Sequence, residues 1–477
     1  MNENPGRRRS PHRPVKAVTP RSSLPAQPVA SPTWPIIVAF ILPLSQLVQF
    51  NLVGNLYLHD LLAPALLILL ITTRWSPGLL QPTKTALILV ATWLLGAIIT
   101  DLYRETPFDD LARGWTRIVL FGINIATLWM LSRGNFKVLS AYSVSYGVAL
   151  CLGSYLYPAR TFFEDPWKFG EGLGVTITIV ALAQFDFVRR RGGDYFAAFL
   201  IGALALFSLW LNSRSLFAMF TLASSYVLFS VWVSKRPDIN RKITPAVFVG
   251  LILGGLAFTQ VITAGYETAA DAGWLGEVAR QKYLDQTAGD TNLLLGGRPE
   301  LAVQVQAIID DPIIGHGSWA QDAYYTKIYF DNLVKLNLPV PRDFADFVGD
   351  TQFRIPTHSH LLGSWTEAGI LGALIWFWTI GLVFRALYAI LKTARSANAL
   401  VALVAMQTLW DVPFSPFGTD ARIFKALEIC LLLAAIMQSK YIAKNAATPR
   451  PVPVPAKAQM VGGRLRPAGR PTPSTVR

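Results

Sequence analysis

The stretch HSHLLGSWTEAGILGALIWFWTIGLVF, residues 358–384, decides the fold class of this chain. It begins with two histidines and a glutamate, and it then continues from Ala368 to Phe384 without a charged side chain. An α-helix needs roughly 20 mostly apolar residues to cross the hydrocarbon core of a bilayer. The stretch therefore predicts a membrane-spanning helix with titratable groups at its start.

The composition of the whole chain agrees with this prediction. The protein has 477 residues, of which 52% are hydrophobic and only 15% are charged, which is too apolar for a soluble globular protein. We expect an all-α polytopic membrane protein with about twelve transmembrane helices. Their apolar windows lie near residues 34–53, 56–73, 84–101, 114–131, 137–157, 172–188, 195–212, 215–233, 243–263, 359–384, 398–414 and 422–440. The second and eleventh windows are the weakest.

The positions of lysine and arginine predict the orientation of these spans, because short basic loops stay in the cytoplasm. The N-terminal tail is strongly basic and lacks the features of a secretory signal peptide. Even-numbered turns are basic, whereas residues 264–356 contain thirteen acidic and seven basic residues. We therefore expect both termini in the cytoplasm and the acidic segment outside.

The predicted organisation is uneven. A disordered basic tail (1–33) precedes spans one to nine (34–263), an external cap loop (264–357), spans ten to twelve (358–440) and a second disordered basic tail (441–477). Long loops without structure are uncommon, so the cap is expected to fold. Transporters are often built from two matched halves, which this arrangement does not resemble.

The net charge of +14 comes mainly from the tails and from the turns predicted to face the cytoplasm. Such basic segments attract anionic lipid, so the charge does not indicate nucleic-acid binding. The two cysteines lie within apolar windows and suggest neither a disulfide framework nor a metal site.

Charged residues inside or beside spans are expensive to bury and are functional candidates. Arg214 lies in a very short outer turn, and Arg298 lies where a helix of the cap is predicted to start. An arginine at the membrane interface and an ordinary surface arginine remain open as alternatives for these two. Structural ion pairs are the alternative for the intramembrane group, which comprises Asp60, Arg117, Glu367, Asp411 and Glu428.

His358 and His360 have three possible roles. Metal binding is one, but residues two apart on a helix point to different faces, and no clear third ligand lies nearby. A structural role at the interface is the second. The third is general-base chemistry, since a neutral imidazole with a pKa near 6.5 can take a proton from a hydroxyl.

Residues 358–372 resemble the signature of the O-antigen ligase and polymerase superfamily of bacterial envelope enzymes. That signature is a histidine, then Asn, Ser or Gln, nine arbitrary residues, and Gly-x-x-Gly. His358, Ser359, Gly369 and Gly372 occupy these positions.

Three further segments extend the resemblance from about Arg214 to the last span. NSRS (212–215) is similar to the family's Ser-Arg-Gly turn. GGRPEL (296–301) and DPIIGHG (311–317) are similar to its Gly-Arg start and its Pro-x-x-Gly-x-Gly end. Ser215 and Pro299 depart from the pattern without removing a charged group.

The resemblance implies a glycosyltransferase with a GT-C-like helical fold. Such enzymes take a glycan from undecaprenyl diphosphate at the outer, periplasmic face of the bacterial inner membrane and pass it to a sugar hydroxyl. The acceptor is lipid A-core in ligases and another lipid-linked repeat unit in polymerases of O-antigen or exopolysaccharide. The ligase and polymerase alternatives both remain open. A repeat-unit flippase and a chain-length regulator are the protein partners that the resemblance implies.

The residues fit this chemistry. Arginines offer planar donors to a leaving diphosphate, and we assign this role to Arg214 and Arg298. His358 is the expected base. The chain contains no Asp-x-Asp pair, so we expect a metal-independent, inverting reaction without a cofactor.

Supporting roles are expected for four residues near the base. His360 and Glu367 lie seven residues apart and share a helical face, which suggests a pair. Gly369 and Gly372 are expected to allow close helix packing behind the site. The alternative function is a transporter or flippase of lipid-linked sugars, in which intramembrane charges would line a pathway.

Overall fold

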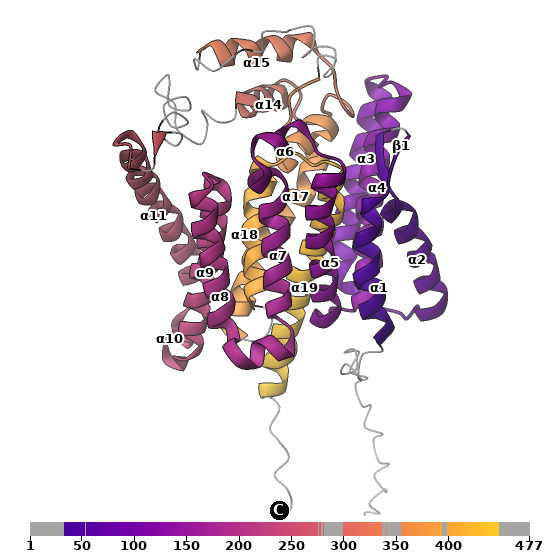
Figure 1. Ribbon diagram of the computed structural model, residues 1–477. Coiled ribbons are helices and arrows are strands. Elements are labelled where there is room, and N and C mark those ends of the chain that lie inside the picture. Colours follow the sequence, from indigo (N-terminus) through magenta and orange to yellow (C-terminus); the bar gives the residue numbers. More distant parts are fainter. Residues whose placement is uncertain are drawn as a thin grey trace, which may run out of the picture.

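The computed structural model describes residues 33–52, 54–274, 299–335, 354–393 and 398–447, together with positions 276, 277, 280 and 340. These residues form a bundle of long helices with a smaller helical layer over one end (Figure 1). Thr33 belongs to α1, and residues 441–447, predicted as the start of a disordered tail, continue α19 as a helix. The rest of both predicted tails, and Arg298, lie outside the described residues.

A helix occupies most of each apolar window. The bundle comprises α1 (Thr33–Leu44), α2 (Leu58–Arg74), α3 (Lys84–Tyr103), α4 (Phe108–Ser132), α5 (Phe136–Leu156), α7 (Gly172–Ala183), α8 (Asp186–Trp210), α9 (Arg214–Ser234), α11 (Pro245–Asp271), α17 (His360–Thr393), α18 (Asn398–Phe414) and α19 (Thr419–Ala447). Short helices α6 (Arg160–Glu164) and α10 (Pro237–Lys242) lie in turns.

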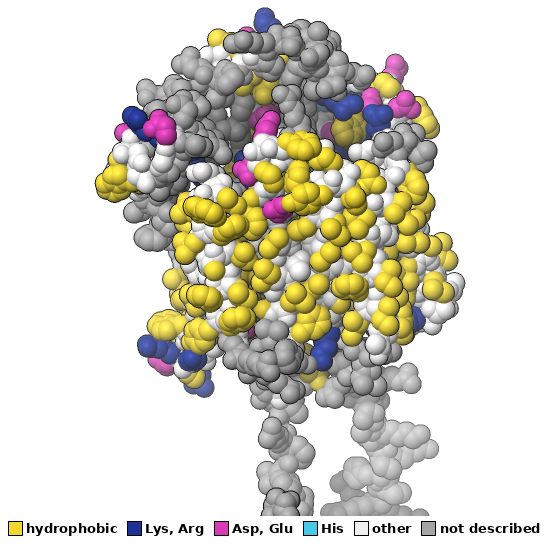
Figure 2. Space-filling view, viewed as in Figure 1, with side chains coloured by type: hydrophobic (Ala, Val, Ile, Leu, Met, Phe, Trp, Pro, Cys, Tyr) yellow, Lys and Arg dark blue, Asp and Glu magenta, His cyan; other side chains and the backbone are white. Residues whose placement is uncertain are grey.

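Six helical segments in the described part of the chain are long and apolar enough to cross a membrane. They are Gln81–Tyr103, Phe108–Ser132, Phe136–Leu156, Gly193–Trp210, Arg214–Ser234 and His360–Thr393. The surface agrees with this property: hydrophobic side chains cover the middle of the bundle, and charged side chains gather mostly towards its two ends (Figure 2). Outward-facing Ile68, Leu95 and Phe199 are more than half exposed, which suits contact with lipid.

The first window differs from its prediction. Helix α1 ends at Leu44, and the chain continues through a short turn into a hairpin of β1 (Gln49–Leu52) and β2 (Gly54–Tyr57). Polar residues at 49, 51 and 55 break the apolar run there. The hairpin leads straight into α2, where the Asp60 carboxylate accepts a hydrogen bond from the Tyr57 backbone at 2.8 Å.

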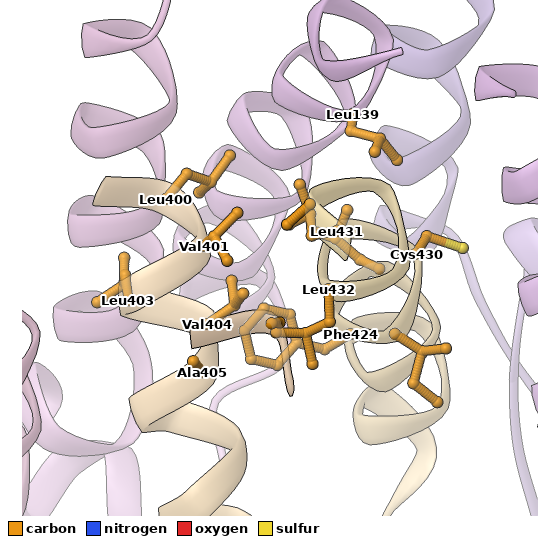
Figure 3. Close-up of a cluster of buried hydrophobic side chains, with 14 of the residues drawn as sticks. Leu139, Leu400, Val401, Leu403, Val404, Ala405, Phe424, Cys430, Leu431 and Leu432 are labelled. Atoms are coloured by element: carbon orange, nitrogen blue, oxygen red, sulfur yellow. The ribbon is translucent and has the colours of Figure 1, made fainter. Parts of the chain in front are cut away.

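The first two turns of α18, from Ala399 to Ala405, are apolar and buried on all sides. Leu400, Val401, Leu403, Val404 and Ala405 are almost completely buried, and Figure 3 shows Val401 and Val404 on the side of α18 that faces α19. A helix that is hydrophobic around its whole circumference belongs inside a bundle. Helices α9, α17 and α19 surround it.

Charged side chains buried inside the bundle are paired with one another. Arg422 contacts Asp60 with both ends of its guanidinium, one of them from Nε to Oδ1 at 3.1 Å. The Lys425 ammonium lies 2.6 Å from Asp411 and 2.7 Å from Glu428. Buried charges are tolerated when each has an opposite partner and further hydrogen bonds. The structure therefore supports the structural alternative for Asp60, Asp411 and Glu428.

The described part of the cap contains α14 (Pro299–Asp310) and α15 (Ala323–Lys335). As predicted, α14 begins at Pro299 and ends just before Pro312. Figure 1 shows both helices at one end of the bundle, whereas α1 begins and α19 ends at the opposite end. Helix α14 also packs against α17.

Candidate active site

A cavity of about 280 Å³ lies where the cap meets α17. Its walls come from both layers, and aromatic, basic and acidic side chains occur together in them. Lining residues with polar or aromatic side chains are Glu300, Trp319, Tyr329, Arg354, Thr357, His358, Thr366 and Glu367. Such a mixed cavity between two layers is the usual setting of a ligand site.

His358 reaches this cavity from the extended segment just before α17, and its side chain is half-buried. The neighbouring Ser359 fixes that segment. Its hydroxyl accepts a hydrogen bond from Leu362 N at 3.0 Å, as a helix cap does, and donates to Val412 O at 2.9 Å. Ser359 thus anchors the start of α17 to α18 and leaves His358 at the cavity wall.

Helix α17 is kinked about two turns further along, at Ala368 and Gly369. Two carbonyls at the kink accept hydrogen bonds from the cap: His316 N donates to Thr366 O at 2.7 Å, and Gly317 N donates to Glu367 O at 3.1 Å. In an uninterrupted helix these carbonyls would bond residues four positions further on. The kink therefore provides acceptors that hold the cap in place.

Glycines make this contact possible. Gly369 has φ +61°, and a Cβ atom there would lie 1.8 Å from the Ile313 carbonyl oxygen. Gly315 has φ +87°, and its Cβ would lie 2.6 Å from Gly369 N. The expectation that Gly369 serves helix packing needs correction, because it contacts the backbone of the cap. Gly372 lies close to Ser364 O across the kink of its own helix.

Helix α3 holds the same cap segment from its other side. The Asp101 carboxylate accepts from Ser318 N at 2.6 Å, from the Ser318 hydroxyl at 2.8 Å and from Trp115 Nε1 at 2.7 Å. The Thr100 hydroxyl donates to Ile314 O at 2.5 Å, and Arg104 pairs with Asp311. The segment Asp311–Gly317, which resembles a family motif, and Ser318 after it are therefore fixed to α3 and α17 together.

Trp319 follows this segment and enters the cavity wall. Its backbone has φ +54°, a conformation that bulky residues rarely adopt. The guanidinium carbon of Arg354 lies 5.0 Å from the centre of its ring, and that of Arg117 lies 5.6 Å from the same ring. No sequence signal marks Arg354 or Trp319, since each is a single residue outside any periodic pattern.

Glu367 pairs with Arg117 of α4, so the predicted pair with His360 is wrong. Seven residues along a helix place two side chains on one face but about 10.5 Å apart along the axis, too far for direct contact. His360 is buried instead among aromatic rings, with centroids 5.0 Å from Trp376 and 5.3 Å from Phe417. It does not line the cavity.

Of the two predicted diphosphate-binding arginines, the structure describes Arg214, which does not share the cavity with His358. Arg214 is the first residue of α9, half-buried, and is not in the cavity wall. Arg298 lies outside the described residues, two positions before Glu300, which does line the cavity.

Tyr329 and Glu300 form a polar corner of the cavity that the sequence did not reveal. The Tyr329 hydroxyl lies 3.5 Å from Glu300 Oε1. Burial, and then the neighbouring Glu300 carboxylate, raise the pKa of Tyr329 to about 12. The phenol therefore stays protonated at neutral pH and acts as a donor.

Over the described ranges, no group of three or more His, Cys, Asp or Glu side chains could hold a metal ion. Metal independence remains an expectation, which a chelation experiment addresses below. No protein-family model matches the chain, and no curated protein matches it either.

Proposed function

We propose that the protein is a glycosyltransferase of the bacterial inner membrane that moves a glycan from undecaprenyl diphosphate to a sugar hydroxyl at the outer face. The strongest support is the position of His358, which lines a cavity between an apolar bundle and a polar cap. A lipid-linked sugar needs both surroundings, one for the chain and one for the glycan. The motifs shared with O-antigen ligases and polymerases give independent support.

In this reaction His358 removes the proton from the acceptor hydroxyl as that oxygen attacks the anomeric carbon. The bond from this carbon to the diphosphate oxygen breaks, the bonding electrons leave with the diphosphate, and attack from the opposite side inverts the anomeric configuration. Arg214 and Arg298 stay our candidates for stabilising the leaving diphosphate. Ligases and polymerases use the same kind of donor and differ in the acceptor. The proposed roles concern the donor and the base, so they favour neither class.

The transporter alternative has weaker support. The bundle charges on Asp60, Asp411, Arg422, Lys425 and Glu428 make pairs with one another. Paired charges of this kind stabilise a fixed core, whereas a transport pathway needs charges exposed to a water-filled route.

We further propose that about twelve helices span the membrane in a GT-C-like arrangement, with both termini in the cytoplasm and the cap in the periplasm. In a background without the two native cysteines, Arg280→Cys and Phe330→Cys should react with an impermeant thiol reagent in cells with a permeabilised outer membrane. Arg190→Cys and Asp238→Cys should react only after the inner membrane is opened. Labelling of Arg190→Cys in unopened cells would contradict this topology and the site assignment with it.

Transfer should not require a divalent metal. Purified protein in detergent, given undecaprenyl-diphosphate-linked glycan and an acceptor, should form product at the same rate in excess EDTA. A glycosyltransferase with an Asp-x-Asp metal site, assayed in parallel, confirms that the chelator works. Loss of transfer in EDTA and its recovery with magnesium or manganese would show that arginines alone do not stabilise the leaving group.

A further inference from the structure

Three N–H groups around the cavity have no acceptor in the described part of the chain. They are Nε of Arg117, Nε of Arg354 and Nε1 of Trp319, each shielded from solvent. Buried donors are almost always hydrogen-bonded, so three together need an explanation. All three are donors only, which indicates that the missing component is rich in acceptors.

The charges beside these donors point to an anion. Arg117 already pairs with Glu367 and donates to Phe417 O at 3.2 Å. Arg354 has no carboxylate partner among the residues that the structure describes, and it faces the same indole ring as Arg117. Because Glu367 already offsets the charge of Arg117, the charge that a bound anion would offset is mainly that of Arg354.

The backbone of Trp319 adds an independent observation. Its positive φ is unfavourable for a bulky side chain, and such strain tends to occur at functional sites, where the surroundings enforce it. The two residues before Trp319 are held by hydrogen bonds, Gly317 to α17 and Ser318 to Asp101, and these bonds enforce its backbone conformation. The fold therefore keeps Trp319 near the two arginines against a conformational cost.

We propose that Arg354, Trp319 and Arg117 form a diphosphate-binding subsite beside His358. This inference rests on the proposed function and adds a group of residues to Arg214 and Arg298. A diphosphate offers several acceptor oxygens and negative charge, which match planar guanidinium donors and an indole N–H. Because Arg354 and His358 line the same cavity, the leaving group and the base come together in it.

The two carboxylates that line the cavity, Glu367 and Glu300, differ in whether a cation neutralises them. The charge of Glu367 is neutralised by Arg117, whereas Glu300 lies near the Tyr329 hydroxyl and has no cation partner in the described residues. An anion is therefore repelled from the Glu300 corner and attracted to Arg354 and Trp319.

The test is equilibrium binding of undecaprenyl diphosphate to the purified full-length protein in detergent. Arg354→Gln should weaken binding about 10-fold to 100-fold, the range for losing a hydrogen-bonded charge, and Arg354→Lys should restore part of it. Trp319→Phe keeps a ring but removes the N–H, and should weaken binding about 3-fold to 10-fold. Lys327→Gln removes the same charge from an exposed position of α15 and should bind like wild type.

Two competitors distinguish the sources of phosphate. Inorganic pyrophosphate should displace the lipid from wild type, and this competition should weaken in Arg354→Gln. Phosphatidylglycerol vesicles should not displace it. Equal displacement by phosphatidylglycerol would overturn the assignment in favour of a general lipid-headgroup site.

The subsite and the proposed function fail in different ways. Unchanged affinity in both Arg354→Gln and Trp319→Phe, in a protein that still transfers glycan, would overturn the subsite alone. Absence of both diphosphate binding and transfer in wild type would overturn both. Thermal unfolding of each variant shows whether a loss of binding reflects a loss of fold.

Discussion

Replacing Gly369 by alanine should separate the cap from the bundle and reduce glycan transfer by at least about 100-fold, the cost typical of small misplacements at a reacting centre. The backbone of Gly369, at φ +61° and ψ −162°, lies in a region that is open essentially to glycine alone. An added Cβ would also meet the Ile313 carbonyl oxygen at 1.8 Å and its carbon at 2.5 Å. These are backbone atoms, so no side-chain rotation relieves the collision.

The expected damage extends from the kink to the cavity. Moving the cap breaks the hydrogen bonds from His316 N and Gly317 N to α17, and it displaces Trp319 as well. Backbone strain of about 1–3 kcal/mol and two lost hydrogen bonds of about 0.5–1.5 kcal/mol each should lower the free energy of unfolding by roughly 2–6 kcal/mol.

Gly381 provides the matched control for this substitution. It lies in the same helix, and an added Cβ there would have open space around it, so Gly381→Ala should keep transfer and stability. Both variants are compared by thermal unfolding in detergent and by transfer assay. Wild-type transfer and stability in Gly369→Ala would show that the cap does not depend on the kink.

Local signals were enough to predict the helices of the bundle. A helix in lipid satisfies its own backbone, so a sufficiently long apolar run indicates a helix whatever its neighbours are. The prediction failed at the β1–β2 hairpin, where Gln49 and Asn51 alternate with apolar residues inside the window 34–53. Averaging over about 20 residues conceals such alternation.

Contacts between distant segments could not be predicted in the same way. Arg422 and Asp60 are 362 positions apart, and nothing near either residue indicates the other. The pairing of Glu367 with Arg117 likewise depends on how α4 packs beside α17. Helical periodicity, the basis for expecting His360 beside Glu367, assigns a face but not a partner.

The candidate site was predictable only where a motif marked it. His358 was found through its spacing to Gly369 and Gly372, yet the same spacing suggested helix packing and not a kink that binds the cap. Arg354 and Trp319 have no such marker. They lie near His358 because the cap packs against α3 and α17. That packing depends on Gly315 and Gly317 in the cap and on Asp101 in α3, more than 200 positions earlier in the sequence.

Loss of His358 should have the largest effect on chemistry. His358→Ala should lower the rate of transfer about 100-fold to 10,000-fold, the usual range for removing a general base. Donor binding should persist, because the proposed diphosphate contacts come from arginines and from Trp319. His358→Gln keeps hydrogen-bonding capacity without basicity and should be as slow as His358→Ala.

His360 offers the comparison within the same motif. His360→Phe removes an imidazole but suits the aromatic cluster of Trp376 and Phe417, so measurable transfer should remain. Wild type and the three histidine variants are first shown to be folded by thermal unfolding. Equal losses in His358→Ala and His360→Phe would indicate a structural effect of the motif.

Single-turnover transfer with the donor already bound tests the central assignment most directly. Protein loaded with undecaprenyl-diphosphate-linked glycan is mixed with excess acceptor, and the appearance of product is followed over time. We predict that His358→Ala retains the bound donor and forms product about 100-fold to 10,000-fold more slowly than wild type. A rate close to that of wild type would contradict the assignment of His358 as the base and would direct attention to Glu300 in the same cavity.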